Sequence, residues 1–572
     1  MSALSVSVAM TGSGGAGVLT SGHILLKAAG AAGYFGHMRR TVGPQIRGGE
    51  SAALLRLSAE EVLCPADETD VLVGFDWNNV GRFATELAVG PNSWVITDPS
   101  EGSVPDFLRE SGARVIEIPM SQLAEAIPDG RVNMVGLGVV AEAIGLPLEP
   151  MRGILTKMLA RKGPEAAQAS FAALEAGAAA VRGLTELPKL PVAQPSAEER
   201  WNVSGNEMTA LGAVKAGVRF VAAYPITPAT DILEWLAPNL PKLGGQLIQA
   251  EDELASINMC LGASFGGVPS MTATSGPGLS LMMESLGLAV AAEIPVLVVD
   301  VQRGGPSTGL PTKSEQSDLN IAVHGHHGDA PLVVTAPLSV ADCAFTAGWS
   351  LHLAESLQCP VLLLSEQVLG HSRVVVRRPR AFEGQAQRRL ATAVDLAQSY
   401  QRYRITPDGI SPMAVPGMAG GEHTLDGLEH NPHGDPSPKA EDHQAQTDKR
   451  WRKLADFDYG ADWADVAGQG ETAVITFGST FGAAREALAR TGGGFRHIGL
   501  RLLHPPQPAK MAAALAGVSR VLVVEQNHGG QLHKLLRAHH DLPGRVMSFC
   551  RPGPLPIRPR EIEDWVAQED QP

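Results

Sequence analysis

Three short segments between residues 224 and 312 combine residue types that can hold and activate a small anionic substrate. The first is Tyr224-Pro225-Ile226-Thr227-Pro228, which follows an apolar strand and fixes the hydroxyl of Thr227 between two prolines. Pro228 is expected near the first turn of a helix, where its missing N–H costs little. An isolated turn of this kind is more often a stiff connection than a site, but the neighbouring segments favour a site.

The second segment pairs acidic residues with a glycine-rich turn. Glu251, Asp252 and Glu253 open a predicted helix over residues 252–265, and carboxylates in the first turn of a helix can serve only as caps. The next predicted strand, 270–274, runs into Thr274-Ser275-Gly276-Pro277-Gly278. Because ligands of α/β proteins bind at the carboxyl ends of parallel strands, we expect the acid and this turn to face each other.

The third segment carries an arginine at the end of a buried strand. We expect residues 295–301 to form a fully apolar parallel strand, after which Gln302-Arg303-Gly304-Gly305 turns towards Thr312. A guanidinium can hold a carboxylate in a bidentate clamp while threonine hydroxyls orient the rest of the molecule. The alternative is that Arg303 pairs with an acid on a partner chain.

The chain of 572 residues is long enough for several domains, and three are predicted. Strands alternating with helices indicate an α/β fold with a mostly parallel sheet in the first domain, residues 1–184. A Pro-rich linker spans 185–200, and a doubly wound domain spans 201–370. An irregular connection over 371–465, including a solvated His-rich loop, precedes a small α/β domain over 466–572.

Composition narrows the class of function. A net charge of −14 and the lack of a long basic run argue against nucleic acid as a partner. We find no signal peptide and no apolar stretch able to span a bilayer, so a cytoplasmic location is expected. The five cysteines are scattered without a CxxC pair, which supports neither a disulfide framework nor a cluster site, and the loop histidines match no metal-ligand spacing, so no metal is assigned.

The order of Glu253, Gly262 nine residues later and then TSGPG resembles the pyrimidine-binding domain of thiamine-diphosphate enzymes. In those enzymes a glutamate binds N1′ of the aminopyrimidine and promotes its imino tautomer. The resemblance implies this role for Glu253, with Glu251 as the alternative, and implies cofactor contacts at residues 274–278. A carboxyl group shielded by an apolar helix suits such a role.

Taken together, YPITP and the stretch from Val301 to Thr312 resemble the alpha subunit of 2-oxoacid:ferredoxin oxidoreductases. The resemblance implies catalytic roles for Glu253, Thr227 and Arg303, and substrate binding by Thr227, Arg303 and Thr312. The implied reaction joins a 2-oxoacid, coenzyme A and oxidised ferredoxin to give acyl-CoA, CO₂ and reduced ferredoxin.

The first domain resembles the gamma module of the same family, through the segment from Arg40 to Ser51. A glycine turn follows its first strand, and its backbone amides can cradle a phosphate. The residues proposed for coenzyme A or for a subunit interface are Gly12, Gly14, Gly15, Gly17 and Arg47. A nicotinamide is disfavoured because His37-Met38-Arg39-Arg40 stands where an acid is needed.

The third domain, with Val524-Glu525-Gln526-Asn527-His528-Gly529-Gly530, resembles the transketolase C-terminal domain, and no catalysis is assigned to it. No GDG motif for a diphosphate-bound Mg²⁺ occurs in the sequence. The family places Mg²⁺ and a [4Fe–4S] cluster on a beta subunit, which implies an (alpha-beta)₂ heterotetramer that reduces ferredoxin. The gamma-then-alpha order favours 2-oxoglutarate; pyruvate, branched-chain 2-oxoacids, a non-oxidative split lyase and a non-catalytic scaffold are the alternatives.

Overall fold

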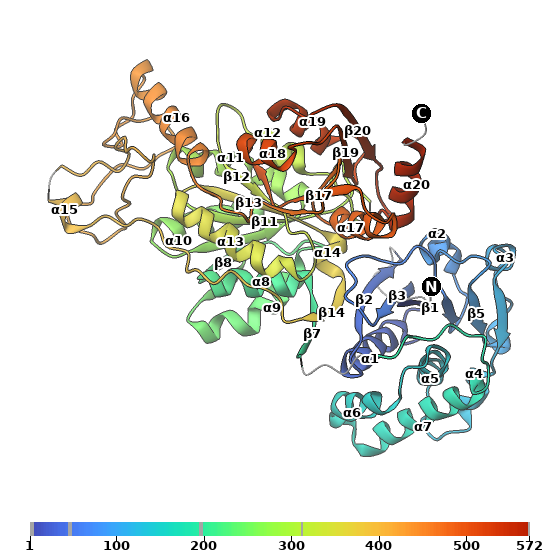
Figure 1. The fold of residues 1–572 in the computed structure, drawn as a ribbon. Helices are drawn as coiled ribbons and strands as arrows, with labels where there is room; N and C mark the ends of the chain where they lie inside the picture. The colour runs from blue at the N-terminus through green and yellow to red at the C-terminus, as the bar shows by residue number, and fades with distance from the viewer. Residues whose placement is uncertain (1–4, 44–48, 194–197, 311–312, 398, 570–572) are drawn as a thin grey trace. The chain divides into compact units, whose positions relative to one another are not determined.

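The structure, a computed structural model, describes residues 5–43, 49–193, 198–310, 313–397 and 399–569. The chain divides into two compact units (Figure 1). The first contains residues 1–204, 371–379 and 558–561, and the second contains residues 205–370, 380–557 and 562–572. No helix among the described residues is long and apolar enough to cross a membrane.

The first unit is built on an eight-stranded sheet that is only partly parallel. Its strands, in spatial order, are β6 (Arg114–Glu117), β5 (Trp94–Thr97), β4 (Val71–Gly74), β1 (Ser5–Ser13), β3 (Glu50–Ser58), β2 (Phe35–Val42), β14 (Arg373–Arg377) and β7 (Arg200–Ser204). The pairs β6/β5, β5/β4 and β4/β1 are parallel, and the pairs from β1/β3 to β14/β7 are antiparallel. The predicted mostly parallel sheet is therefore wrong for this domain, because residues 35–58 fold back as two adjacent antiparallel strands rather than crossing over through a helix.

Helices cover this sheet and pack closely against one another. They are α1 (Val18–Ala31), α2 (Ala84–Leu87), α3 (Asp106–Glu110), α4 (Met120–Glu125), α5 (Val132–Ile144), α6 (Glu149–Met158) and α7 (Pro164–Val181). Helix α1 lies on β2 and β3. Helices α5 and α7 approach so closely that a Cβ on Gly138 or Gly177 would collide with the backbone of the other helix, so only glycine permits this crossing.

Strands β7 and β14 shift the boundaries expected from the sequence. Both strands belong to the first sheet. From the sequence, residues 200–204 were expected at the end of the linker and the start of the second domain. Residues 373–377 were expected in the irregular connection. Helices α15 (Ala393–Leu396) and α16 (Ala440–Ala455) also lie in that connection, so the irregular part is shorter than expected. Strands β7 and β14 find their partners in a distant part of the chain, which local composition does not reveal.

The second unit contains a seven-stranded sheet that is parallel except at one edge. Its order is β18 (Leu502–His504), β12 (Val333–Thr335), β13 (Pro360–Glu366), β11 (Val296–Gln302), β10 (Ser270–Thr274), β8 (Phe220–Ala223) and β9 (Gln246–Gln249), with β18 antiparallel to β12. The chain runs from β8 outward to β9 and then back across to β10 and β11. The strand order therefore reverses between β8 and β10, which is where doubly wound sheets bind ligands.

Helices flank the seven-stranded sheet. They are α8 (Gly205–Ala216), α9 (Thr230–Asn239), α10 (Glu253–Phe265), α11 (Gly276–Ala291), α12 (Leu319–His324), α13 (Asp342–Leu357) and α14 (Gln367–His371). Helix α8 packs with α13 and α9, and α10 packs with α11. The β-α-β crossovers run in opposite directions along the sheet. They therefore place α8, α9 and α13 on one face of the sheet and α10 and α11 on the other (Figure 1).

A five-stranded sheet completes the second unit. Its order is β15 (Ala464–Ala467), β17 (Phe495–Leu500), β16 (Thr472–Thr476), β19 (Arg520–Glu525) and β20 (Arg545–Cys550), all parallel except β15. Its helices are α17 (Thr480–Arg490), α18 (Pro508–Ala514), α19 (Gln531–His539) and α20 (Pro559–Glu569). The α/β fold with three sheet-based domains, predicted from the sequence, is confirmed, and two of these domains form one compact unit.

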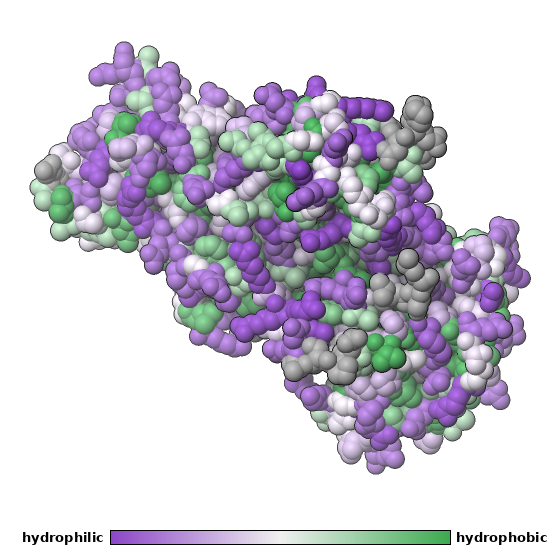
Figure 2. All heavy atoms as spheres, viewed as in Figure 1, coloured by the Kyte–Doolittle hydropathy of each residue, from purple (hydrophilic) through white to green (hydrophobic). Residues whose placement is uncertain are grey.

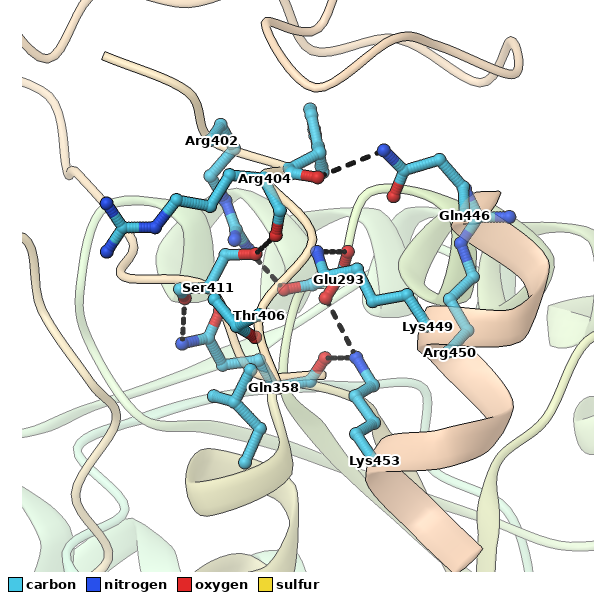
Figure 3. Close-up of polar contacts among 12 residues, drawn as sticks. Glu293, Gln358, Arg402, Arg404, Thr406, Ser411, Gln446, Lys449, Arg450 and Lys453 are labelled. Carbon is cyan, nitrogen blue, oxygen red and sulfur yellow. Dashed lines mark hydrogen bonds and ion pairs between the residues drawn. The ribbon is translucent and has the colours of Figure 1, made fainter. Parts of the chain in front are cut away.

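Buried charges anchor the chain on both sides of residues 406–443, the loop expected to be solvated. Glu293, which follows α11, receives hydrogen bonds from Lys449 Nζ (2.6 Å) and Lys453 Nζ (3.0 Å), and all three side chains are almost fully buried (Figure 3). Arg402 Nη2 donates to the backbone carbonyl of Glu293 at 2.8 Å. Two lysines from α16 surrounding one acid explain how a polar helix docks on this domain. The surface of helix α16 that is visible in Figure 2 carries mainly hydrophilic residues.

Of the histidines in this loop, His430 is buried, His423 and His433 are half-buried and His443 is exposed. His430 is buried and packs edge-on against Tyr403, with ring centroids 3.7 Å apart. His443 Nδ1 lies 2.8 Å from Glu429 Oε2, and Arg450 contacts both oxygens of that carboxylate. Among the described residues, no group of three or more His, Cys, Asp or Glu side chains is arranged to hold a metal ion. These contacts assign the segment a packing role.

Candidate active site

The turn that carries Thr227 is fixed from two directions. It follows β8 and precedes α9, which begins at Thr230, two residues after Pro228. The buried side chain of Asn206 donates from Nδ2 to the Pro228 carbonyl at 2.9 Å, and Arg303 Nη1 donates to the Thr227 carbonyl at 2.7 Å. Thr227 itself is exposed at the carboxyl edge of the sheet. Arg303 and Thr227, which are 76 residues apart in sequence, are therefore adjacent in the fold.

The three acids at the start of α10 have different environments. Asp252 is the helix cap, because its Oδ1 accepts a hydrogen bond from the backbone N–H of Ala255 at 2.7 Å. Glu251 is exposed, whereas Glu253 is only 7% exposed. Within the described residues, no hydrogen bond or ion pair reaches the Glu253 carboxylate. Glu253 is therefore the acid that is enclosed at this edge with its carboxylate unpaired among the described residues, so the geometry favours Glu253 over Glu251 as a ligand-binding group.

The TSGPG turn lies directly against Glu253, as expected from the sequence. Thr274 ends β10, Ser275 is the N-cap of α11, and the helix begins at Gly276. A Cβ on Gly278 would lie 2.6 Å from Glu253 Oε1 and would also overlap the Thr274 hydroxyl. Glycine is needed here so that the helix can approach the carboxylate. The buried hydroxyl of Ser275 has no hydrogen-bond partner among the described residues, which leaves a second group free to bind a ligand.

The structure adds a pair of acids that the sequence analysis missed. Asp300 is fully buried within β11, so the strand expected to be fully apolar is not. Asp318 is 9% exposed, and a Cβ on Gly276 would lie 2.8 Å from both of its carboxylate oxygens. A single acid inside an otherwise apolar strand is the signal that could have identified Asp300, because unpaired acids are rarely buried. Asp318 had no such signal, because only the fold brings it beside Gly276.

The two carboxyl groups perturb each other. Burial, followed by the charge of Asp318, raises the pKa of Asp300 well above its usual range. Burial raises the pKa of Asp318 to about 6, although Ser317, Asp300 and Arg303 lower it. Both shifts disfavour simultaneous ionisation of the two buried carboxyl groups.

The third domain fixes the segment that carries Asp318. Gln316 and Gln526 exchange hydrogen bonds: the backbone N–H of Gln526 donates to Gln316 Oε1 at 2.8 Å, and the Gln316 N–H donates to the Gln526 carbonyl at 2.8 Å. Gln531 Nε2 donates to the Ser317 carbonyl at 3.0 Å. Glu525 caps α19 through the N–H groups of Leu532 and His533. The turn at 525–531 therefore supports the site without entering it.

Two predicted site residues, Thr312 and Arg47, lie outside the described residues. The glycines of the first domain lie in the other unit. Gly14, Gly15 and Gly17 line a hollow of about 390 Å³ at the start of α1, opposite Gly49 and Glu50. Gly15 and Gly17 have φ angles of 102° and 82°, which only glycine adopts without strain. Arg82 Nη1 lies 2.9 Å from Glu50 Oε1 and balances the only acid lining the described part of this hollow.

Comparison with known proteins identifies the family. The profile described as "Pyruvate flavodoxin/ferredoxin oxidoreductase, thiamine diP-bdg" matches residues 211–449, and "Pyruvate ferredoxin/flavodoxin oxidoreductase" matches residues 7–180. The 2-oxoglutarate oxidoreductase subunit KorA of Mycobacterium tuberculosis is 35% identical over 531 residues, covering 86% of this chain and 80% of the relative. The chain belongs to the 2-oxoacid:ferredoxin oxidoreductase family. The resemblance inferred from YPITP, TSGPG and the Arg303 segment is thereby confirmed.

Other members of the 2-oxoacid:ferredoxin oxidoreductase family match along almost the whole chain. The 2-oxoacid:ferredoxin oxidoreductase subunit alpha of Saccharolobus solfataricus is 29% identical and covers 92% of each chain. The solved 2-oxoglutarate:ferredoxin oxidoreductase from Magnetococcus marinus, with 2-oxoglutarate, coenzyme A and succinyl-CoA bound, has a TM-score of 0.92 and 37% identity, covering 100% of each chain. The match includes all three sheets.

Proposed function

We propose that this chain is the alpha subunit, with a fused gamma domain, of a 2-oxoglutarate:ferredoxin oxidoreductase. The enzyme converts 2-oxoglutarate and coenzyme A to succinyl-CoA and CO₂, and it passes the two electrons to ferredoxin. The observation that carries the proposal is the buried, unpartnered Glu253 against the TSGPG turn, with Thr227 and Arg303 at the same edge of the sheet. The likeness to the Magnetococcus marinus enzyme along the whole chain supports the choice of substrate.

The residues at this edge fit the aminopyrimidine half of thiamine diphosphate. When bound, this cofactor supplies the electron sink that makes loss of CO₂ from a 2-oxoacid possible. Glu253 would accept a hydrogen bond from N1′, and residues 274–278 would contact the ring, since Gly276 and Gly278 leave no side chain in the way. The low exposure of the Glu253 side chain would strengthen that hydrogen bond, because fewer water molecules would compete for it.

Arg303 and Thr227 would bind the substrate next to this acid, with Thr312 as the third substrate contact. Arg303 already donates to the Thr227 carbonyl, and its buried Nε has no partner among the described residues. Its remaining donors can hold the 2-oxoacid carboxylate in a bidentate arrangement while the Thr227 hydroxyl orients the 2-oxo group. This chain therefore binds, orients and shields the substrate.

The remaining components belong to a beta subunit in our proposal. Four of the five cysteines are buried, and no CxxC or GDG sequence is present, so a [4Fe–4S] cluster and the Mg²⁺ of the diphosphate are assigned to the partner. Beside the site, the exposed apolar side chains of Leu254, Met259 and Leu281 support a subunit contact. We infer an (alpha-beta)₂ heterotetramer in the cytoplasm that passes electrons to ferredoxin.

Coenzyme A is assigned to the glycine hollow of the first domain. The first-turn amides of α1 and the nearby glycines suit a phosphate group, since a helix N-terminus favours an anion. The large hollow leaves room for part of the nucleotide. The competing interpretation is that this surface serves only as a subunit interface. A coenzyme A site predicts that changes in the hollow alter the KM for coenzyme A, whereas an interface does not.

The decisive experiment is anaerobic reduction of a low-potential electron acceptor by this chain co-expressed with its beta subunit. Coenzyme A is supplied with 2-oxoglutarate, pyruvate or 2-oxoisovalerate in separate reactions. We expect reduction with 2-oxoglutarate. Reduction with another acid would retain the mechanism and correct the substrate, whereas CO₂ release without acceptor reduction would indicate a non-oxidative enzyme and overturn the proposal.

A further inference from the structure

The buried charges around Glu293 do not balance. Lys449, Lys453 and Arg402 bring three positive charges to one carboxylate, and none of these four residues is more than 3% exposed (Figure 3). Among the described residues, Glu293 is the only acid that forms an ion pair with either lysine, and Arg402 forms no ion pair. A buried charge without a counter-charge is costly. The cluster therefore lacks negative charge.

Arg402 is the part of this cluster whose hydrogen bonds are incomplete. Its Nη2 donates to the Glu293 carbonyl at 2.8 Å, but Nε and Nη1 are buried without a hydrogen-bond partner in the described part of the chain. The guanidinium carbon lies 5.2 Å from the centroid of the Tyr403 ring, which contributes a weak cation–π attraction but no acceptor atom. Buried N–H donors are almost always paired. These two nitrogens therefore require an acceptor that the described residues do not supply.

The other acids of the neighbouring loop are engaged elsewhere. Both oxygens of Glu429 are held by Arg450, at 3.1 and 2.7 Å. Asp426 accepts a backbone N–H from its own turn and forms no ion pair within the described ranges. Burial lowers the pKa of His423 and His430, so both rings are neutral at pH 7 and add no charge. None of these side chains balances Arg402.

Loss of a proton from Lys449 is the competing explanation for the cluster. Burial lowers the pKa of Lys449 to about 7, so deprotonation would remove one positive charge. It would still leave Arg402 Nε and Nη1 without an acceptor, and a guanidinium does not lose its own proton at this pH. An anion beside Arg402 satisfies both the charge and the hydrogen bonds, whereas the deprotonated lysine satisfies only part of the charge.

We propose that Arg402 binds a small inorganic anion, chloride or one of similar size, through Nε and Nη1, and that this anion helps to hold residues 399–455 against the end of α11. Because Arg402 has no exposed surface, the anion must be small enough to be fully enclosed. The surrounding positive charges exclude a cation. The site lies apart from the groups assigned to the cofactor and the substrate, so it goes beyond the proposed function.

The position of this site makes it separable from catalysis. Arg402 contacts the carbonyl of Glu293, two residues after α11 ends at Ala291, whereas the TSGPG turn opens the same helix at Gly276. The anion therefore lies at the opposite end of a 16-residue helix from the candidate active site. Stability, rather than turnover, is the property that reports on its binding.

Thermal unfolding of this chain in complex with its beta subunit tests the proposal. The midpoint is measured at pH 7 in sodium chloride and in sodium gluconate of equal ionic strength, since gluconate is too large to be enclosed. Each tenfold increase in chloride above its Kd should stabilise the wild-type complex by about 1.4 kcal/mol relative to a protein that lacks the site. Bromide should replace chloride.

Two arginine variants separate specific binding from general effects of salt. Arg402→Gln removes the cation that holds the anion, so its midpoint should lose the chloride-dependent increment. Arg404→Gln is the matched control, because Arg404 is exposed and pairs with Asp395 at 2.9 Å; it should keep the increment. The same chloride dependence in wild type and Arg402→Gln would overturn the inference, as would its loss in both variants.

Crystals of the wild-type complex grown in sodium bromide give a readout that does not depend on whether Arg402→Gln folds. We expect an anomalous-scattering peak within hydrogen-bond distance of Arg402 Nε or Nη1. A water molecule at that position without an anomalous peak would overturn the inference and leave loss of the Lys449 proton as the explanation for the cluster.

Discussion

The carboxylate of Asp318 packs so tightly against Gly276 that a Cβ on the glycine would lie 2.8 Å from both carboxylate oxygens. These two residues belong to segments that the sequence separates by more than 40 positions, and each segment carries a different part of the proposed site. Gly276 begins the helix that faces the cofactor, and Asp318 lies on the segment held to Arg303 through Ser317. Glycine at 276 is therefore required for the two parts to fit together.

Replacing Gly276 tests this packing. In Gly276→Ala the new methyl group must displace Asp318 or the turn, so we expect kcat/KM for 2-oxoglutarate to fall by about 10-fold to 100-fold, or about 1.4–2.7 kcal/mol. Gly287→Ala on the same helix is the matched control, since no atom lies within 4 Å of its Cβ position. The control should retain activity and gain up to ~1 kcal/mol of stability. Equal losses in both variants would contradict the packing argument.

The role of Glu253 is tested by removing only its charge. We expect Glu253→Gln to lower kcat at least ~100-fold, because an amide cannot promote the imino tautomer of the aminopyrimidine as a carboxylate does. The thermal unfolding midpoint should not fall, since the substitution removes a buried charge without a partner among the described residues. Glu251→Gln, at an exposed neighbouring position, should keep wild-type turnover. The reverse pattern would assign the activating acid to Glu251.

The glycine hollow is tested by adding a negative charge to it. Thr20 is exposed, lines the hollow and lies in the first turn of α1, where an acidic residue does not destabilise the helix. Thr20→Glu should raise the KM for coenzyme A at least ~10-fold by repelling its phosphates, with the KM for 2-oxoglutarate unchanged. Thr20→Gln controls for size. If neither substitution changes the KM for coenzyme A, the hollow serves another purpose, such as a subunit interface.

The buried cluster around Glu293 makes a prediction about stability. Glu293→Gln leaves Lys449 and Lys453 buried without their counter-charge, and breaking such a pair costs about 3–5 kcal/mol. Denaturant unfolding followed by circular dichroism should show a lower midpoint. Glu441→Gln on the exposed start of α16 should change the free energy of unfolding by less than ~1 kcal/mol. Similar midpoints for the two variants would show that the cluster does not anchor this helix.

Buried His497 predicts how acid affects the third domain. Burial lowers the pKa of His497 to about 3, and its Nε2 lies 2.9 Å from the Thr476 hydroxyl. A histidine with a lowered folded-state pKa stabilises the fold fully above the unfolded pKa of about 6.5, and this contribution is lost as the pH falls towards the folded pKa. Between pH 7 and 5 we expect a loss of about 2 kcal/mol from this residue. His497→Gln should reduce the pH dependence of the unfolding midpoint, and an unchanged slope would contradict the assignment.

The sequence located most elements of the second domain because their signals are local. Strands β10 and β11 lie within two residues of their predicted positions, since each is a short, mainly apolar run bounded by Pro, Gly or polar residues. The first sheet was less predictable. Strands β7 and β14 pair with each other across 170 residues of chain, and no local pattern specifies which sheet such strands join.

What the sequence by itself determined is the identity and order of the site segments: YPITP, the acids opening α10, TSGPG and the Arg303 turn. Their chemistry resides in the residue types and their short-range spacing, and a parallel sheet brings strand ends to one edge. Only the tertiary structure separated Glu253 from Asp252 and Glu251, and only it placed Asp318 against Gly276. Burial and proximity depend on chain segments far apart in sequence, so packing decided which of these acids lies enclosed at the site.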